Sequence, residues 1–338
     1  MNPPWGTRIF RTGADQVIMG QVRSIKRPVH GWLILDKPTG MTSNQALGAV
    51  KRLYKPKKAG HAGTLDPLAT GMLPIAFGEA TKTVPFVMDG RKVYRFTVTW
   101  GVETNTDDSE GESIDTSDVR PDKEAILAAL PTFCGEIQQI PPQFSALKIN
   151  GQRAYDLARE GEVVELAARP ISVHRLDLVD MPDRDTAIFE AECGKGTYVR
   201  SLARDIGRHL GSCGHVSALR RLLVGPFGED TMISLEKLNS LAHSAPREED
   251  LAHHLHPIET ALDDIPALAI NRNEAASLRR GQPILLRGRD APSESGPTCV
   301  MSAGALVAIG EIDCGELHPK RIFNLPTASE QRPFENEE

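Results

Sequence analysis

Strand patterns and helix patterns follow one another along this chain without the regular strand–helix–strand repeat of a doubly wound fold. Residues 93–102 and 186–193 carry alternating apolar side chains, which is typical of a strand with one face on a core. Residues 46–53 and 202–210 instead carry apolar side chains at helical spacing. This irregular order predicts an α+β fold with a mixed, largely antiparallel sheet flanked by helices.

The chain has 338 residues, a length at which two domains of about 150 residues each are expected. The composition changes over residues 242–257, a stretch with His, Glu and Pro that suggests a linker. A helix at 273–280 and a hairpin turn at 303–304 are predicted beyond it. The predicted organisation is a disordered leader (1–28), a large domain (29–250), a small β-rich domain (258–325) and a flexible tail (326–338).

Several classes of protein are excluded by composition. No apolar stretch approaches the roughly 20 residues of a membrane helix, and no secretory signal follows Arg8 and Arg11. The five cysteines are scattered and form no CxxC motif, which argues against a zinc site and against a disulfide framework. We therefore expect a cytoplasmic protein with reduced thiols, no membrane partner and no bound metal ion.

The net charge of −6 is unevenly distributed along the chain. Residues 1–100 contain 15 Lys or Arg and 5 Asp or Glu, a local net charge of +10, whereas residues 101–130 contain 2 and 9. A local excess of cations is what phosphate binding requires, so a nucleic-acid partner is compatible with the acidic average. Residues 104–118 fail the calcium-loop template, and we expect them to form a solvated acidic loop.

The most unusual segment is residues 60–71, GHAGTLDPLATG. Its three glycines and its proline indicate a rigid, tightly turned backbone. Asp66 lies in the middle of this segment, and His61 lies five residues earlier. Spacing alone leaves two interpretations open: Asp66 shapes a turn before proline, or the stiff loop presents its carboxylate at a cleft.

Several separate motifs of residues 30–235 resemble, in the same order, those of the TruB family, the bacterial tRNA pseudouridine synthases that modify uridine 55 in the T-loop. The matching segments are residues 35–43, 60–71, 78–82, 141–148, 195–200 and 215–222. Residues 258–325 resemble, to a lesser extent, the PUA-like RNA-binding domain of that family. The resemblance implies a pseudouridine synthase fold, tRNA as the partner, bound through its T-arm, and isomerisation of uridine as the activity. Because substrate and product are isomers, no redox cofactor is needed, and no metal is expected.

The resemblance implies that Asp66 is the catalytic residue. The reaction breaks the N1–C1′ bond of uridine and joins C5 to C1′. A carboxylate can serve such a centre as nucleophile, as electrostatic stabiliser or as base toward the sugar, and the sequence does not choose among these roles. By the same resemblance Arg200 pairs with Asp66, and a bidentate guanidinium would hold the charge and orientation of the carboxylate.

The resemblance also implies a set of residues that bind the substrate. Tyr94 matches a tyrosine that packs on the target base, and Tyr198 matches another that lines the pocket, since a ring can stack on a flipped base. His61 matches a histidine that contacts RNA where the target leaves the loop. Leu219 matches an apolar residue of the uridine pocket, and Lys37 is expected at the pocket edge. Without the resemblance, Tyr94 and Leu219 would be assigned to the core.

Three function hypotheses remain. The first is an RNA-modifying isomerase, the second is a non-catalytic RNA-binding protein that uses the same surface, and the third is a related synthase acting on another RNA, such as the guide-directed type. The Asp66 loop and Arg200 favour an enzyme, because a protein that only binds RNA has no need for a buried ion pair.

Overall fold

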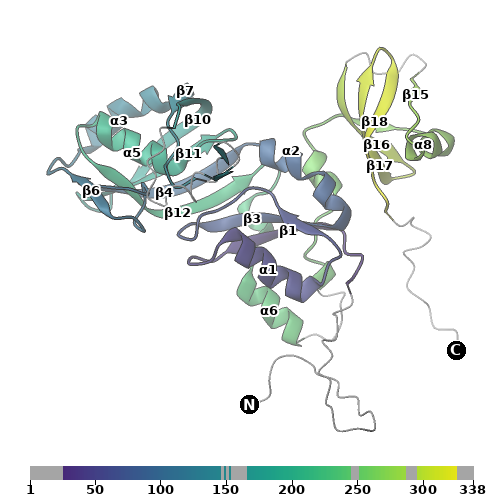
Figure 1. Ribbon diagram of the computed structural model, residues 1–338, viewed down its shortest axis with the longest axis horizontal. Helices are drawn as coiled ribbons and strands as arrows, with labels where there is room; N and C mark the ends of the chain where they lie inside the picture. Colours follow the sequence, from purple (N-terminus) through teal and green to yellow (C-terminus); the bar gives the residue numbers. More distant parts are fainter. Residues whose placement is uncertain are drawn as a thin grey trace, which may run out of the picture.

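The computed structural model describes residues 26–145, 148–149, 152–153, 166–244, 251–286 and 295–325, which form a large α+β unit and a small β-rich unit (Figure 1). Arg27 exchanges backbone hydrogen bonds with Lys55 and Lys57, at 2.8 and 3.0 Å, so residue 27 is paired with the large unit, upstream of the boundary predicted at residue 29. The rest of the predicted leader, residues 1–25, and the predicted tail, 326–338, lie outside the described residues.

One sheet runs through the large unit. Its strands, in spatial order, are β13 (Ile233–Ser234), β1 (Gly31–Lys37), β3 (Thr70–Phe77), β12 (Gly214–Val224), β4 (Lys92–Trp100), β11 (Thr186–Cys193), β10 (Arg169–Asp180) and β7 (Gly135–Gln139), with β2 (Ala59–His61) paired to β3. Strand pairs β1–β13 and β3–β12 are parallel, and the other pairs are antiparallel. The prediction of an α+β fold with a mixed, largely antiparallel sheet is confirmed.

Helices and short strands surround this sheet. The helices are α1 (Ser43–Tyr54), α2 (Val84–Asp89), α3 (Lys123–Ala129), α5 (Val199–His209) and α6 (Leu235–Ser244), with 3-10 turns at Gly78–Lys82, Leu130–Phe133, Glu229–Thr231 and Glu259–Leu262. The short strands form two ribbons, β5 (Val102–Thr104) with β6 (Ser113–Thr116) and β8 (Lys148–Ile149) with β9 (Gln152–Arg153). The helices in the described part of the chain are all too short or too polar to cross a membrane.

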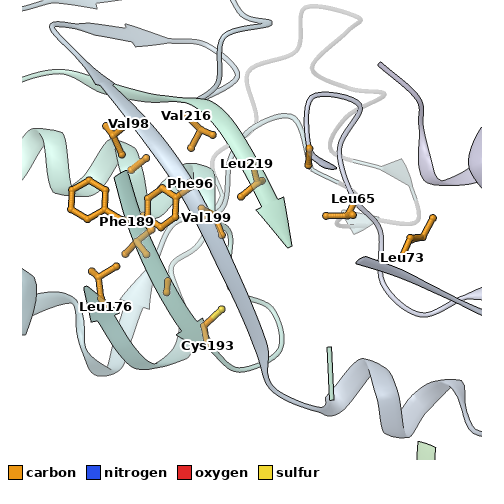
Figure 2. Packing of buried hydrophobic residues seen from close by; sticks show 14 of the residues in the cluster. Leu65, Leu73, Phe96, Val98, Leu176, Phe189, Cys193, Val199, Val216 and Leu219 are labelled. Carbon is orange, nitrogen blue, oxygen red and sulfur yellow. The ribbon is translucent and has the colours of Figure 1, made fainter. Parts of the chain in front are cut away.

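The core of the large unit follows the predicted alternation of apolar residues. Phe96 and Val98 of β4 are buried against Phe189 of β11, and the rings of Phe96 and Phe189 stack with centroids 5.5 Å apart (Figure 2). Val199 of α5 and Leu65, from the loop after β2, belong to the same cluster. The loop that carries Asp66 is therefore anchored in the main core through its own leucine.

The parallel junction of β3 and β12 requires a glycine. Gly71 has φ +92°, and a Cβ at this position would collide with the backbone oxygen of Arg221. The pairing is short, Arg220 with Thr70 and Arg221 with Gly71, and it lies where the loop after His61 returns to the sheet. The absence of a side chain at Gly71 therefore lets the two strands meet beside this loop.

The small unit is a five-stranded sheet with one helix. Its spatial order is β14 (Ala267–Ala269), β16 (Gly296–Ser302), β17 (Ala305–Asp313), β18 (Glu316–Ile322) and β15 (Ile284–Leu285), packed against α8 (Arg272–Arg279). The turn between β16 and β17 contains Ala303 and Gly304, both with positive φ. The predicted helix, hairpin and β-rich composition of this unit are confirmed.

Residues 251–256 of the predicted linker are held against the large unit by hydrogen bonds. Trp32 and His256 exchange backbone hydrogen bonds of 2.9 and 2.7 Å, and the Tyr54 hydroxyl donates to the Leu251 carbonyl at 2.9 Å. Strand β13 pairs only with residues 35–36 of β1 and does not reach Trp32. The backbone amide and carbonyl of Trp32 therefore form their hydrogen bonds with His256 instead.

The two units share a buried cluster. Trp32 and Phe227 of the large unit pack in the same cluster as Ile309 and Phe323 of the small unit. Polar contacts surround Phe323: Glu79 accepts from the Asn324 amide at 2.7 Å, and Lys82 donates to the Ile322 carbonyl at 2.6 Å. The small unit is thus fixed to the large one by its last strand.

Replacing Phe323 with alanine should therefore loosen this attachment. We expect Phe323→Ala to lower the free energy of unfolding by about 3 kcal/mol, because it opens a cavity in a cluster where Phe323 is buried. Leu285→Ala, at an exposed apolar residue of the same unit, should change it by less than about 0.5 kcal/mol. Denaturant unfolding measures both; equal effects of the two variants would contradict the shared cluster.

Candidate active site

The loop between β2 and β3 is held by buried groups on both sides. Ser43, at the start of α1, accepts from the Leu65 amide at 2.8 Å and donates to the Leu65 carbonyl at 2.9 Å. Arg221 of β12 donates to the Met72 carbonyl at 2.7 Å and, more weakly, to the carbonyls of Gly63 and Thr64. These contacts fix the loop backbone directly before Asp66.

Lys37 has a different place from the one the sequence predicted. It is fully buried at the end of β1, where its ammonium donates to the carbonyls of Met41 at 2.7 Å, Pro38 at 2.9 Å and Pro67 at 3.4 Å. Burial lowers the pKa of Lys37 to about 8, and the Asp66 carboxylate partly opposes this shift. Lys37 therefore holds the Asp66 loop through the Pro67 carbonyl and is not among the residues that line the cavity.

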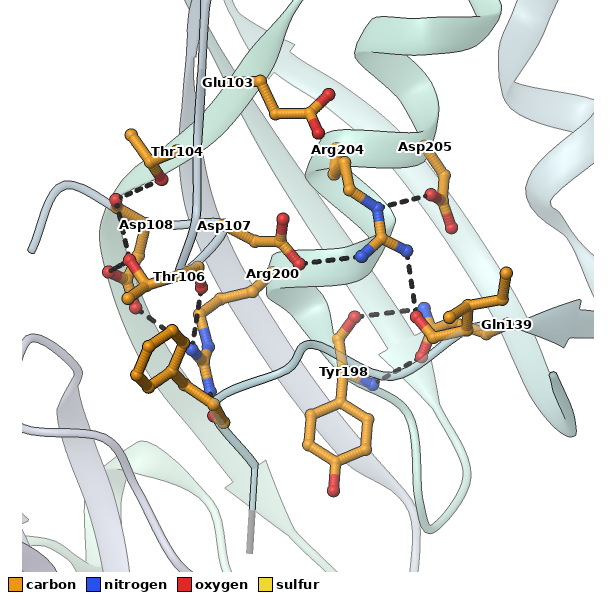
Figure 3. Close-up of polar contacts among 12 residues, drawn as sticks. Glu103, Thr104, Thr106, Asp107, Asp108, Gln139, Tyr198, Arg200, Arg204 and Asp205 are labelled. Carbon is orange, nitrogen blue, oxygen red and sulfur yellow. Dashed lines mark hydrogen bonds and ion pairs between the residues drawn. The ribbon is translucent and has the colours of Figure 1, made fainter. Parts of the chain in front are cut away.

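Asp66 faces Arg200, as the resemblance implied. The Nε of Arg200 lies 3.0 Å from Oδ2 of Asp66, with the arginine side chain 8% exposed and the aspartate side chain 39% exposed. The contact uses Nε and not the bidentate fork, because both terminal nitrogens bind elsewhere. Nη1 donates to the Thr106 carbonyl at 2.8 Å and contacts Asp108 at 3.3 Å, and Nη2 donates to the Phe144 carbonyl at 2.9 Å (Figure 3).

A cavity of about 380 Å³ opens beside Asp66. Of the predicted substrate-binding residues, Tyr94, Tyr198, Arg200 and Leu219 line it together with Asp66. Tyr94 is half-buried at the cavity, whereas Phe96, further along β4, is buried in the core. The structure thus brings these predicted residues together, from four separate parts of the chain.

Gln139 holds the backbone of Tyr198, and burial affects the phenols of both cavity tyrosines. Gln139 accepts from the backbone amide of Tyr198 at 2.8 Å and donates to its carbonyl at 3.1 Å (Figure 3). Burial raises the pKa of Tyr198, and the nearby Ser145 hydroxyl and Arg200 partly oppose the shift. Burial also raises the pKa of Tyr94, opposed by Arg221. Both phenols therefore stay neutral near pH 7, which suits stacking on an uncharged base.

His61 lies outside the residues that line the cavity. It is part of β2, opposite Ile75 of β3, and its buried Nδ1 has no hydrogen-bond partner. Burial and the nearby Arg221 lower the pKa of His61, so its imidazole is neutral near pH 7. The structure therefore places His61 next to the Asp66 loop and not in the cavity itself.

The acidic stretch of residues 104–118 was predicted to be solvated, and for its first part this is wrong. Asp107 and Asp108 are buried, 5% and 2% exposed, and form ion pairs with Arg204 and Arg200. One signal in the sequence could have revealed them: Arg200, Arg204 and Arg208 recur every four residues, which places three cations on one face of a helix. Such a face needs acidic partners.

Other chemistry is not suggested by the arrangement. In the described ranges, no group of three or more His, Cys, Asp or Glu side chains is placed to hold a metal ion. All five cysteines lie in the described residues and are free thiols. What the site presents is one partly exposed carboxylate, oriented by a buried guanidinium, beside a cavity with aromatic walls. This set of groups suits chemistry at an electrophilic carbon of a flat ligand.

Two family models match the chain. TruB family pseudouridylate synthase (N terminal domain) matches residues 51–199, and the tRNA pseudouridylate synthase B C-terminal domain matches residues 200–263. The tRNA pseudouridine synthase B of Bradyrhizobium diazoefficiens is 64% identical over 325 residues, 96% of this chain and 94% of that protein. The corresponding protein of Agrobacterium fabrum is 58% identical over 300 residues, 88% and 95% of the two chains.

Solved structures agree on the fold. A chain from an H/ACA RNP bound to a substrate RNA containing 2′-deoxyuridine superposes with a TM-score of 0.68 at 24% identity, covering 88% of this chain and 86% of that one. A chain of the archaeal box H/ACA sRNP Nop10–Cbf5 complex gives 0.66 at 26% identity, covering 87% and 86%. With the high identity of the curated relatives over nearly its whole length, the chain belongs to the TruB family of pseudouridylate synthases.

Proposed function

We propose that this protein converts uridine 55 in the T-loop of tRNA to pseudouridine. The relative named tRNA pseudouridine synthase B at 64% identity supports tRNA as the substrate. The observation that carries the proposal is the contact of Asp66 with Arg200 at a cavity lined by Tyr94 and Tyr198. A volume of about 380 Å³ lies within the range of about 300–1,000 Å³ that is usual for small-ligand sites. It therefore suits a single flipped nucleotide.

The reaction exchanges one bond to C1′ for another. The N1–C1′ bond breaks, the base turns within the cavity, and C5 bonds to C1′; C5 loses its proton and N1 gains one. Asp66 serves this centre as nucleophile, as electrostatic stabiliser or as base toward the sugar, and each role needs an oriented carboxylate. Arg200 supplies the orientation, because its buried guanidinium is itself held by the carbonyls of Thr106 and Phe144.

The substrate-binding residues act around the flipped base. Tyr94 and Tyr198 offer ring faces for stacking, and Leu219 closes the apolar wall of the cavity. His61, next to the loop, contacts the RNA where the nucleotide leaves the T-loop. The small β-rich unit, residues 258–325, adds affinity for the tRNA as a PUA-like domain. The cytoplasmic location, which rests on the scattered cysteines, stays a prediction.

Asp66→Asn tests the catalytic assignment. Asparagine keeps the size of the side chain and a turn-forming oxygen but has no negative charge. We expect single-turnover conversion of an unmodified tRNA to fall by orders of magnitude, while tRNA binding and the melting temperature change little. Asp89→Asn is the matched control, because Asp89 is an exposed carboxylate of the same cavity whose partner is Lys195.

A folded Asp66→Asn protein that makes pseudouridine at the wild-type rate would return Asp66 to a turn role. If the wild-type protein binds tRNA and makes no pseudouridine, the non-catalytic RNA-binding hypothesis holds instead. Conversion of a different RNA, with none of tRNA, would favour the third hypothesis.

Tyr94→Leu tests base stacking. Loss of a stacked ring typically costs about 1–3 kcal/mol per base, so productive capture of the target should weaken by about tenfold or more. Tyr94→Phe keeps the ring and should retain most of the activity, and His61→Ala should weaken capture less than Tyr94→Leu. Fluorescence of a base analogue at the target position reports the flipped state. An unchanged signal and rate in Tyr94→Leu would assign Tyr94 to the core.

A further inference from the structure

Three arginines of α5 lie one turn apart and bind three carboxylates of one acidic segment. Arg208 contacts Glu103 at 2.9 Å through Nε. Arg204 contacts Asp107 at 2.8 Å, and Arg200 contacts Asp108 at 3.3 Å (Figure 3). Among these, Arg200 reaches Asp66, and Arg208 lies at the exposed end with 57% of its side chain accessible. The middle pair, Arg204 with Asp107, is buried, with side chains 9% and 7% exposed.

Arg204 joins the same two parts of the chain that Arg200 joins. Its Nη1 binds Asp107 and its Nη2 donates to the Ile140 carbonyl at 2.9 Å, while Nε contacts Asp205 at 2.9 Å. Arg200 in turn binds Thr106 and Asp108 on one side and Phe144 on the other. The two guanidiniums therefore clamp the 104–108 turn against the 140–144 segment at neighbouring points.

Asp107 is the central residue of that turn. Its backbone has φ +60°, its amide donates to the Thr104 carbonyl at 3.1 Å, and its carbonyl accepts from the Val216 amide at 3.1 Å. Asp108 follows it and is held by the hydroxyls of Thr104 and Thr106, both at 2.6 Å. A shift of Asp107 would therefore move Thr106 and Asp108, the groups that orient Arg200.

We propose that the ion pair of Arg204 with Asp107 positions the catalytic centre: it fixes the 104–108 turn so that Thr106 and Asp108 hold Arg200 against Asp66. Neither Arg204 nor Asp107 lines the cavity, so both act through Arg200. The proposal rests on the proposed catalytic role of Asp66. It adds a pair of positioning residues to the reaction.

The pair is sensitive to mild acid. Burial raises the pKa of Asp107 to about 6; Arg204 and Arg200 oppose this shift, and Glu103 and Asp205 add to it. Asp108 and Arg208 are the other charged groups of the facing elements. Protonation of Asp107 as the pH falls through about 6 removes the negative charge that Arg204 binds. The single-turnover rate should fall over the same range.

Stability should move in the opposite direction. Because the pKa of Asp107 is higher in the folded state than its ordinary value near 3.8, the folded state takes up this proton first. The contribution of Asp107 to stability therefore increases as the pH falls from about 6 toward 4, and is lost as the pH rises through about 6. If the single-turnover rate falls below about pH 6 while the contribution of Asp107 to stability increases, Asp107 acts by positioning the site and not merely by stabilising the fold.

The test compares Asp107→Asn, Asp107→Glu and Arg204→Gln with the wild-type protein on unmodified tRNA. At pH 7.5 we expect Asp107→Asn and Arg204→Gln to lower the single-turnover rate at saturating enzyme by about tenfold or more, with the tRNA Kd within about twofold, because small misplacements near a reacting centre slow the chemistry strongly. Asp107→Glu, which keeps the charge, should recover part of the rate. The double variant should be no slower than Arg204→Gln alone, since both substitutions break the same ion pair.

Arg208→Gln is the matched control. It breaks the ion pair of the next turn between the same helix and the same acidic segment, at a residue that contacts neither Arg200 nor the 140–144 segment in the described structure. We expect it to lower the melting temperature and leave the rate unchanged. The NMR signal of the Arg200 Nε–H group should shift in Asp107→Asn and stay in place in Arg208→Gln.

The proposal is overturned if Asp107→Asn keeps the wild-type rate, or if the rates of Asp107→Asn and Arg208→Gln fall alike in step with their melting temperatures. Should Asp107→Asn not fold, the pH profiles of the wild type and of Asp107→Glu decide: a wild-type rate that stays flat down to pH 5 overturns it. Failure of the proposed function gives a different result, an Asp66→Asn protein with the wild-type rate. An inactive Asp66→Asn beside a fully active Asp107→Asn rejects the positioning pair alone.

Discussion

The rest of the site depends on the contacts of the Arg200 guanidinium. It is a buried cation, and removing such a charge from water costs several kcal/mol unless its hydrogen bonds are satisfied. Its donors bind Asp66, Thr106, Asp108 and Phe144, so one side chain joins the Asp66 loop, the 104–108 turn and the 140–144 segment. If one of these segments moved independently, a donor of the buried guanidinium would lose its partner. The orientation of the Asp66 carboxylate is thus a property of the whole network.

The sheet supplies the second constraint, at the place where its two halves meet. The parallel contact of β3 with β12 is two residue pairs long and passes over Gly71, where a side chain would collide with Arg221. Arg221 donates to the carbonyls of Gly63 and Met72, and Lys37 donates to those of Met41 and Pro67. Two buried cations among backbone carbonyls make the loop rigid, and a rigid loop keeps its carboxylate in place before substrate binds.

The small unit is packed against the same sheet through a shared buried cluster. Its last strand is followed by Phe323, which is buried in the same cluster as Trp32 of β1, and β1 carries Lys37 at its other end. Residues 251–256, which precede the small unit, are also attached to β1 through the backbone pairing of Trp32 with His256. A substrate that contacts both units therefore meets two surfaces in a defined relation.

Much of this could be predicted from the sequence, because local rules act over a few residues. The alternation of β4 and β11, the helix α1 and the hairpin at Gly304 follow from side-chain periodicity and turn chemistry, and all three are present. The resemblance of the motifs to a known family added Asp66, Arg200 and the pocket tyrosines. These residues lie together as implied.

What only the tertiary structure decided concerns charged residues. Local composition assigned Asp107 and Asp108 to solvent, because a charged side chain is normally exposed. The family resemblance placed Lys37 at a pocket edge, whereas the structure buries it. Their burial depends on partners about 95 residues away for the aspartates, Arg204 and Arg200, and on backbone carbonyls for Lys37. The four-residue spacing of the arginines marks a charged helix face, but not which acidic segment will pair with it. Periodicity records which side of an element is apolar; the pairing of buried charges is set by the three-dimensional approach of distant segments.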